Sequence, residues 1–201
     1  MTSESWDYWR GRQRRRSPLP GAKGPGTPRS DTRLIPVTEL RQRVVVLIPY
    51  FENPAGLERS LESIRPDEPC DVLVVDDGST EEPLDEDSAR GYCHVRGRLY
   101  VLRLDSNQGI EGALNAGLRW IQEAGYEFVA RLDCGDRNHP GRIARQLQFL
   151  DQNPDVVLVG TRAVYVDLEG VERFVLPLPA DHDDILAYLR KNSAFMHPSV
   201  M

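Results

Sequence analysis

The chain has 201 residues, of which 40% are hydrophobic and 28% are charged, and its formal net charge is −6 at pH 7. This length leaves room for one α/β domain and a tail, and the composition excludes both a wholly disordered chain and a disulfide-rich mini-protein. No apolar run reaches the roughly 18 residues of a membrane span, and the N-terminus lacks the apolar core of a secretory signal, so we expect a cytoplasmic protein whose three cysteines are free thiols.

Residues 1–40 differ in composition from the rest of the chain. The first 33 residues hold eight Arg or Lys against three acids, and they are rich in Pro and Gly. Such a segment buries too little apolar surface to fold alone, so we expect a disordered basic arm in front of one domain over residues 41–201. Its charge suits peripheral contact with the inner face of a membrane. We expect no specific binding to nucleic acid.

Beyond the arm, short β-branched runs alternate with stretches of helical period, which is typical of a mostly parallel sheet flanked by helices. The continuously apolar run at 44–49 predicts a first strand that is buried on both faces, and Pro49 ends it. Three further runs predict strands at 71–80, 99–104 and 127–133.

Apolar stripes at helical spacing occupy the intervals between the predicted strands. The three stripes are Leu57, Leu61 and Ile64; Ile110, Leu114, Leu118 and Ile121; and Ile143, Leu147 and Leu150. Ser106 or Asn107 is the expected cap of the second helix. Residues 81–90 read instead as a polar loop.

The last quarter of the chain predicts two smaller elements. Two further apolar runs, at 156–161 and 163–168, precede Glu169-Gly170, which is typical of the turn of a short hairpin. The stretch 181–192 then reads as a helix capped by its first residue.

Polar residues follow each predicted strand. They are Tyr50 and Glu52 after the first strand, Asp76 and Asp77 after the second, 106–109 after the third, and 133–136 after the fourth. In an open parallel sheet, ligands bind beyond the carboxyl ends of the strands, where loops and helix N-termini converge. Carboxylates gathered there repel one another unless a cation or hydrogen-bond donors compensate. A divalent metal that carries a diphosphate is the expected solution.

Five segments of the chain resemble, in order and spacing, the family 2 glycosyltransferases with the GT-A fold. They are "VVVLIPYFENPAGLERSLESI", "DVLVVDDGST", "SNQGIEGALNAGL", "FVARLDCGD" and "HPGRIARQLQFL". The likeness covers roughly residues 44–201, and it implies a Rossmann-like GT-A domain for nucleotide-diphospho-sugars. Relative to that family, the chain looks like the donor-binding half of the domain, incomplete at its C-terminus.

The resemblance implies a nucleoside site after the first two strands. Pro49, Tyr50 and Glu52 would cup the nucleoside, and Asp77 would accept a hydrogen bond from the ring NH of the base, with Asp76 in support. A carboxylate in a dry pocket discriminates well against a base that lacks this donor. The alternative is that Asp76, Asp77 and Ser79 only form an Asx-type turn and cap a helix.

Further residues belong to the same donor-binding set by resemblance. Asn107 and Gly109 would lie beside the nucleotide sugar, and Arg131 and Asp133 would complete the set. The implied donor is a nucleotide-diphospho-sugar with UDP as its nucleotide.

The fourth cluster departs from the family pattern. The family usually has Asp-x-Asp-Asp, whose middle acid binds Mg²⁺ or Mn²⁺, but the third position of the motif is Gly135 here. A metal would therefore use Asp133 and Asp136, with water in its shell, and His197 is a further metal or phosphate contact by resemblance. The alternative is that these acids cap turns and bind donor hydroxyls.

The implied reaction is transfer of the sugar with inversion to an unknown hydroxyl acceptor, in the synthesis of cell-surface polysaccharide or glycoconjugates. A carboxylate base would assist it, but no residue of the chain matches the family's base, so the catalytic residue stays unassigned. One alternative is an inactive nucleotide-sugar binding fragment. A nucleotidyltransferase would need an early Gly-rich phosphate loop, which the chain lacks after its first predicted strand.

Overall fold

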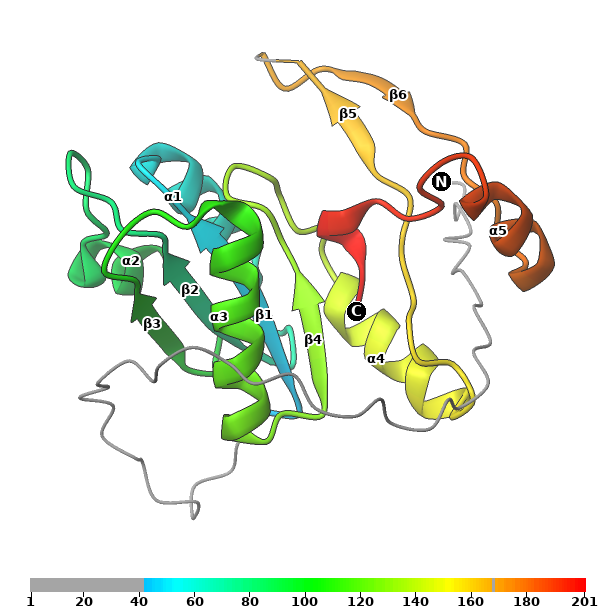
Figure 1. The fold of residues 1–201 in the computed structure, drawn as a ribbon, viewed down its shortest axis with the longest axis horizontal. Coiled ribbons are helices and arrows are strands. Elements are labelled where there is room, and N and C mark those ends of the chain that lie inside the picture. Colours follow the sequence, from blue (N-terminus) through cyan, green and yellow to red (C-terminus); the bar gives the residue numbers. More distant parts are fainter. Residues whose placement is uncertain (1–41, 168) are drawn as a thin grey trace.

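The computed structural model describes residues 42–167 and 169–201, so the arm predicted for residues 1–40 lies outside the described residues. Four parallel strands form the central sheet in the order β3-β2-β1-β4 (Figure 1). Their bounds are β1 Val44–Tyr50, β2 Cys70–Asp76, β3 Leu99–Arg103 and β4 Phe128–Arg131. The predicted parallel sheet is confirmed.

Helices cover both faces of this sheet. On one face, alternate residues of β1 and β2 pack against α1 (Pro54–Ser63), α2 (Glu86–Tyr92) and α4 (Arg142–Gln152). On the other face, the remaining residues of the same strands pack against α3 (Gly109–Ala124). Because β1 and β2 lie in the middle and face helices on both sides, their sequences are continuously apolar rather than alternating.

One helix was not predicted from the sequence. Residues 81–90 were expected to form a loop, but α2 begins within them, and its N-cap Asp85 accepts a hydrogen bond from the Ser88 backbone N–H at 3.2 Å. This helix buries only Ala89. A single buried position leaves no apolar stripe in the sequence, so helical periodicity could not reveal the helix.

The predicted hairpin near the C-terminus is confirmed. Strand β5 (Val164–Val166) pairs antiparallel with β6 (Glu172–Val175), and Tyr165 stacks on Phe174 with ring centroids 4.5 Å apart. The helix expected over 181–192 is shorter, since α5 spans His182–Leu189.

The apolar run at 156–161 forms no strand of either sheet. Instead, Val159 exchanges two backbone hydrogen bonds with Met201, at 2.9 and 2.8 Å. The 3-10 helix η1 (His197–Ser199) precedes this contact. The Arg131 backbone N–H donates to the Val200 carbonyl at 2.8 Å, so the last residues lie along the open edge of β4.

A buried guanidinium joins β4, α4 and the last residues of the chain. Arg142 of α4 donates from Nε to Gln146 Oε1 at 3.0 Å and from Nη1 to Asn138 Oδ1 at 3.3 Å. Its Nη2 donates to the Arg131 carbonyl at 2.8 Å and to the Val200 carbonyl at 3.3 Å. Burial lowers the pKa of Arg142 to about 10, which leaves it charged at neutral pH.

We predict that Arg142→Met destabilises the domain by about 3 kcal/mol or more, because each buried acceptor left without a donor costs about 1–3 kcal/mol. Urea denaturation measures this difference. The matched control is Arg145→Met, an exposed position on the same helix, for which we expect less than about 1 kcal/mol. Equal effects at both positions would contradict the role assigned to Arg142.

Candidate active site

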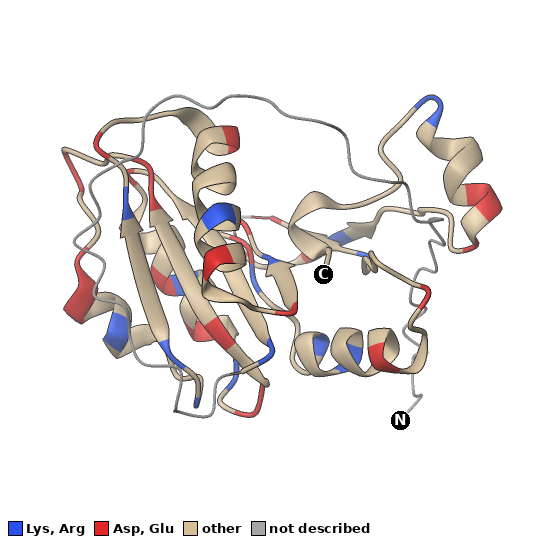
Figure 2. Cartoon of the chain, turned by 60° about the horizontal axis from the view of Figure 1, so that its bottom comes forward, with Lys and Arg blue, Asp and Glu red and all other residues tan. Residues whose placement is uncertain are grey.

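The carboxyl ends of the four parallel strands lie at one edge of the sheet, and the candidate residues follow them. Figure 2 shows acidic segments, among others, in the loops beyond the arrowheads of these strands. Since β2, β1 and β4 are neighbours, the loops that carry Asp77, Glu52 and Asp133 extend from adjacent strands. The sequence prediction that these acids gather at one edge agrees with this topology.

Asp76 and Glu52 both hold the loop at 79–84. The buried Asp76 carboxylate accepts the backbone N–H of Ser79 at 3.0 Å and that of Leu84 at 3.3 Å. This is the Asx-type turn that the sequence left open as an alternative for Asp76.

The Glu52 carboxylate is surrounded by backbone donors. It accepts N–H groups from Thr80 at 2.6 Å, Glu81 at 3.1 Å and Glu82 at 2.5 Å. Partial desolvation pushes the pKa of Glu52 upward, but these three donors hold it below its ordinary value. Glu52 also has a positive φ of 46°, a backbone conformation that is rare outside glycine. The Glu52 carboxylate therefore serves to hold the loop at 79–84.

Tyr50 points into the core rather than into the edge. Its side chain is buried among the residues between the sheet and α1, and its hydroxyl donates to the Glu82 carbonyl at 2.5 Å. Desolvation raises the pKa of Tyr50 to about 12. Tyr50 and Glu52 were both expected to cup a nucleoside. In the structure, both side chains instead form hydrogen bonds to the backbone of the loop at 79–84.

The residue between them was missed by the sequence prediction. Phe51 follows β1 directly and leaves 46% of its surface exposed. An exposed aromatic ring at a strand end is a surface on which a nucleotide base can stack. Its place directly after a buried strand was the signal in the sequence.

Asp77 links the loop after β2 (the second loop) to the loop after β3 (the third loop). It is 3% exposed, its backbone N–H donates to the Tyr50 carbonyl at 2.9 Å, and its Oδ1 accepts the Gln108 N–H at 2.8 Å. Its Oδ2 accepts no hydrogen bond from any residue that the structure describes. One carboxylate oxygen therefore remains to accept a donor from a ligand.

The third loop lies tightly against the second. Gly78 has a φ of 70°, and a Cβ built on it would lie 2.4 Å from the Ser106 carbonyl carbon, so only glycine fits there. Asn107 Oδ1 accepts the Gly109 N–H at 3.0 Å, and both residues are exposed at the rim. The N-cap of α3 is Gln108, without a side-chain hydrogen bond, which corrects the expected cap by Ser106 or Asn107.

The loop after β4 (the fourth loop) is held by hydrogen bonds to Ser60 of α1. Ser60 Oγ accepts the Gly135 N–H at 2.8 Å and donates to the Asp136 carbonyl at 2.8 Å. Desolvation, followed by the charge of Asp133, raises the pKa of Asp136. The two acids thus lie close enough for the charge of Asp133 to disfavour that of Asp136.

Arg131 forms an ion pair with Asp133 through Nη2. The arginine is 6% exposed, and its Nε and Nη1 are buried without a hydrogen-bond partner. Burial lowers the pKa of Arg131, whereas the charge of Asp133 opposes that shift. Two donors of a buried cation therefore have no partner among the described residues.

The predicted metal ligands do not form a metal site by themselves. Within residues 42–167 and 169–201, no three His, Cys, Asp or Glu side chains are grouped so that they could hold an ion. Gly135 has no side chain to offer, and the Asp133 carboxylate is already paired with Arg131. His197 is exposed at the start of η1, and no hydrogen bond joins it to Asp133 or Asp136.

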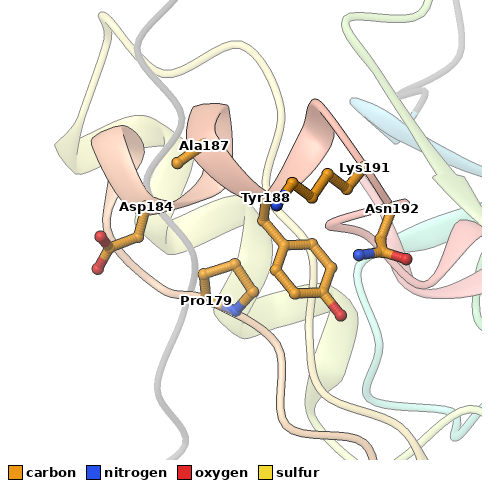
Figure 3. Close-up of a pocket in the computed structure, with 6 residues that line it drawn as sticks. All are labelled: Pro179, Asp184, Ala187, Tyr188, Lys191 and Asn192. Carbon is orange, nitrogen blue, oxygen red and sulfur yellow. The ribbon is translucent and has the colours of Figure 1, made fainter.

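A surface pocket of about 480 Å³ lies elsewhere in the molecule (Figure 3). It is lined by Pro179, Asp184, Ala187, Tyr188, Lys191 and Asn192. These residues belong to α5 and its flanks, and Figure 1 shows α5 well apart from the arrowheads of β1, β2 and β3. This pocket therefore takes no part in the edge site.

A profile of the family described as "Glycosyl transferase family 2" matches residues 45–198. The chain is 32% identical over 160 residues to the amylovoran biosynthesis glycosyltransferase AmsE of Erwinia amylovora, over 78% of this chain and 58% of that protein. It is 27% identical over 161 residues to the UDP-Gal:alpha-D-GlcNAc-diphosphoundecaprenol beta-1,3-galactosyltransferase of Escherichia coli, over 78% of this chain and 56% of that protein. The chain thus spans little more than half the length of these relatives.

A solved structure is also similar. It is a mannosyltransferase from Pyrobaculum calidifontis in complex with GDP-Man and Mn²⁺, with a TM-score of 0.44 and 26% identity, and the match covers 55% of this chain and 33% of that chain. Among the residues described here, no helix has the length and apolar character needed to span a membrane.

We predict a pH-dependent contribution of Glu52 to stability. Its folded-state pKa lies below the ordinary value of 4.5, so its contribution is present above that pH and is lost as the pH falls through the folded-state pKa. Glu52→Gln should lower the melting temperature at pH 7, and the difference from wild type should shrink below about pH 4.5. Glu62→Gln, at an exposed position of α1, is the control and should show no such trend. A difference that does not change with pH would contradict the assignment.

Proposed function

The chain belongs to glycosyltransferase family 2, and from this premise we propose that its domain binds a nucleotide-diphospho-sugar at the carboxyl edge of the sheet for transfer to a hydroxyl acceptor. The parallel sheet between two layers of helices agrees with the GT-A fold expected from the resemblance. The observation that carries the proposal is the state of Asp77, a buried carboxylate with one oxygen held by the third loop and the other unbound.

The base of the donor is the group that we assign to Asp77. A ring NH donating to Oδ2 would pair with an acceptor that has no partner among the described residues. Phe51, exposed on the preceding strand end, supplies a face on which the same base can stack. Glu52 and Asp76 act indirectly, because their carboxylates fix the loop at 79–84 through backbone N–H groups.

UDP is the nucleotide that we propose for the donor. A uracil ring offers one NH, which matches the single free oxygen of Asp77, and a relative from Escherichia coli carries UDP-Gal in its name. We further propose a role in the synthesis of cell-surface polysaccharide or glycoconjugates, on the cytoplasmic side of the membrane. The names of two relatives, which refer to amylovoran and to a diphosphoundecaprenol acceptor, support this role.

The proposed reaction is a single displacement with inversion. The acceptor hydroxyl oxygen forms a bond to the anomeric carbon, the bond from that carbon to the diphosphate breaks, and the nucleoside diphosphate leaves with the bonding electrons. A carboxylate base takes the acceptor proton. We assign no described residue to that base, and we route no step through a metal ion.

The second candidate function is nucleotide-sugar binding without transfer. It is favoured by the absence, among the described residues, of a match to the family's base. We expect the purified protein to bind UDP-sugars, and turnover of a radiolabelled UDP-sugar separates the two functions. Binding with neither transfer nor hydrolysis would support the binding module and contradict the enzyme.

We predict that Asp77→Ala weakens the affinity for UDP by about 1–3 kcal/mol, the cost of leaving a buried donor unpaired. Isothermal titration calorimetry measures the change. Asp105→Ala, an exposed acid after β3, is the matched control and should change the Kd by less than about twofold. Unchanged affinity in Asp77→Ala, with an intact melting transition, would refute the placement of the base.

A further inference from the structure

The edge of the sheet must accept a diphosphate although acids surround it. Glu52 and Asp76 already have their charges offset by backbone N–H groups. The remaining acids near the fourth loop are Asp133 and Asp136, and desolvation and mutual repulsion raise the pKa of the second. An incoming diphosphate therefore needs a positive charge on the side of β4.

The residues that would hold a divalent cation there do not fit that task. Gly135 stands where the family pattern has its central acid, and it has a φ of 104°, a conformation that suits glycine. Asp133 offers a carboxylate whose Oδ1 is bound by Arg131. Asp136 is then the one acid of this loop left to an ion, and within the described residues no third His, Cys, Asp or Glu side chain is grouped with these two acids.

Arg131 supplies a fixed positive charge at the same place. It ends β4, its guanidinium is 6% exposed, and only Nη2 has a partner among the described residues, namely Asp133. A buried guanidinium with two unused donors is costly unless a ligand takes them up. Its planar array of donors matches the geometry of phosphate oxygens.

We propose that the diphosphate of the donor is held by Arg131 and that the site binds nucleoside diphosphates without a divalent metal. This inference rests on the proposed function and names the group that takes up the leaving charge. The Asp133 carboxylate occupies the guanidinium in the free protein, and its side chain is 33% exposed. Asp133 and the diphosphate therefore compete for the same cation.

The first test is the metal dependence of binding. We titrate the full chain with UDP, and in parallel with GDP, by calorimetry in excess EDTA and then with added MgCl₂ or MnCl₂. The inference expects Kd values that agree within about twofold across these conditions. A Kd at least about tenfold weaker in EDTA, which is about 1.4 kcal/mol, overturns it. That result leaves the proposed function standing, whereas no binding under any condition removes both.

The second test asks by mutation whether Arg131 holds the diphosphate. Arg131→Gln should weaken UDP binding by about tenfold or more, because it removes charge-assisted hydrogen bonds. Arg137→Gln, at an exposed position of the same loop, is the control and should change the Kd by less than about twofold. An Arg131→Gln variant that melts as wild type does and binds UDP equally well contradicts the inference.

Asp133→Asn gives a readout that does not depend on folding of the arginine variant. If Asp133 competes with the diphosphate, its neutralisation leaves UDP binding in EDTA unchanged or tightens it. If Asp133 is a metal ligand, the same change weakens binding in MnCl₂ by about tenfold or more, which overturns the inference.

Discussion

Backbone N–H groups, rather than cations, hold the acids at the carboxyl edge of this sheet. Glu52 accepts three of them, Asp76 two and Asp77 one, and all come from loops that follow β2 and β3. These bonds offset the repulsion that several carboxylates at one edge would otherwise produce. They also fix the loops. Asp76 holds the loop that follows its own strand, Glu52 joins the end of β1 to that same loop, and Asp77 joins the end of β2 to the loop after β3. The loops after β2 and β3 are therefore held by hydrogen bonds within the chain.

The fourth loop is organised in a different way, and this difference bears on function. Its acid Asp133 is paired with the buried Arg131 instead of with backbone donors, and Gly135 contributes no side chain. In the proposed donor site, the nucleoside half is built from carboxylates that accept backbone hydrogen bonds, whereas the diphosphate half contains a cation with unused donors. Recognition of the base and compensation of the phosphate charge are assigned to different strands.

The Arg142 network determines where the fourth loop lies. One guanidinium binds the carbonyls of Arg131 and Val200 and the side chains of Asn138 and Gln146, so it joins β4, α4 and the last residues of the chain. Gln146 extends the network by donating to the Ser199 carbonyl at 2.9 Å. Buried polar networks of this kind specify one arrangement because every member loses its partner in any other. The predicted stripe of α4 contained only its apolar residues, so these polar contacts were not foreseen.

The sequence by itself determined the parallel sheet, three of its flanking helices, the hairpin and the gathering of acids after the strands. Those features follow from hydrophobic period and from the polarity of parallel strands, which are local properties of the chain. Only the tertiary structure decided what each acid does. Glu52 and Tyr50 read from the sequence as walls of a nucleoside site, yet their partners are the backbone of residues 80–82. Hydrogen bonds between segments some 30 residues apart leave no periodic trace in a sequence, and they separate the carboxylates that support the loops from the one that is left to bind.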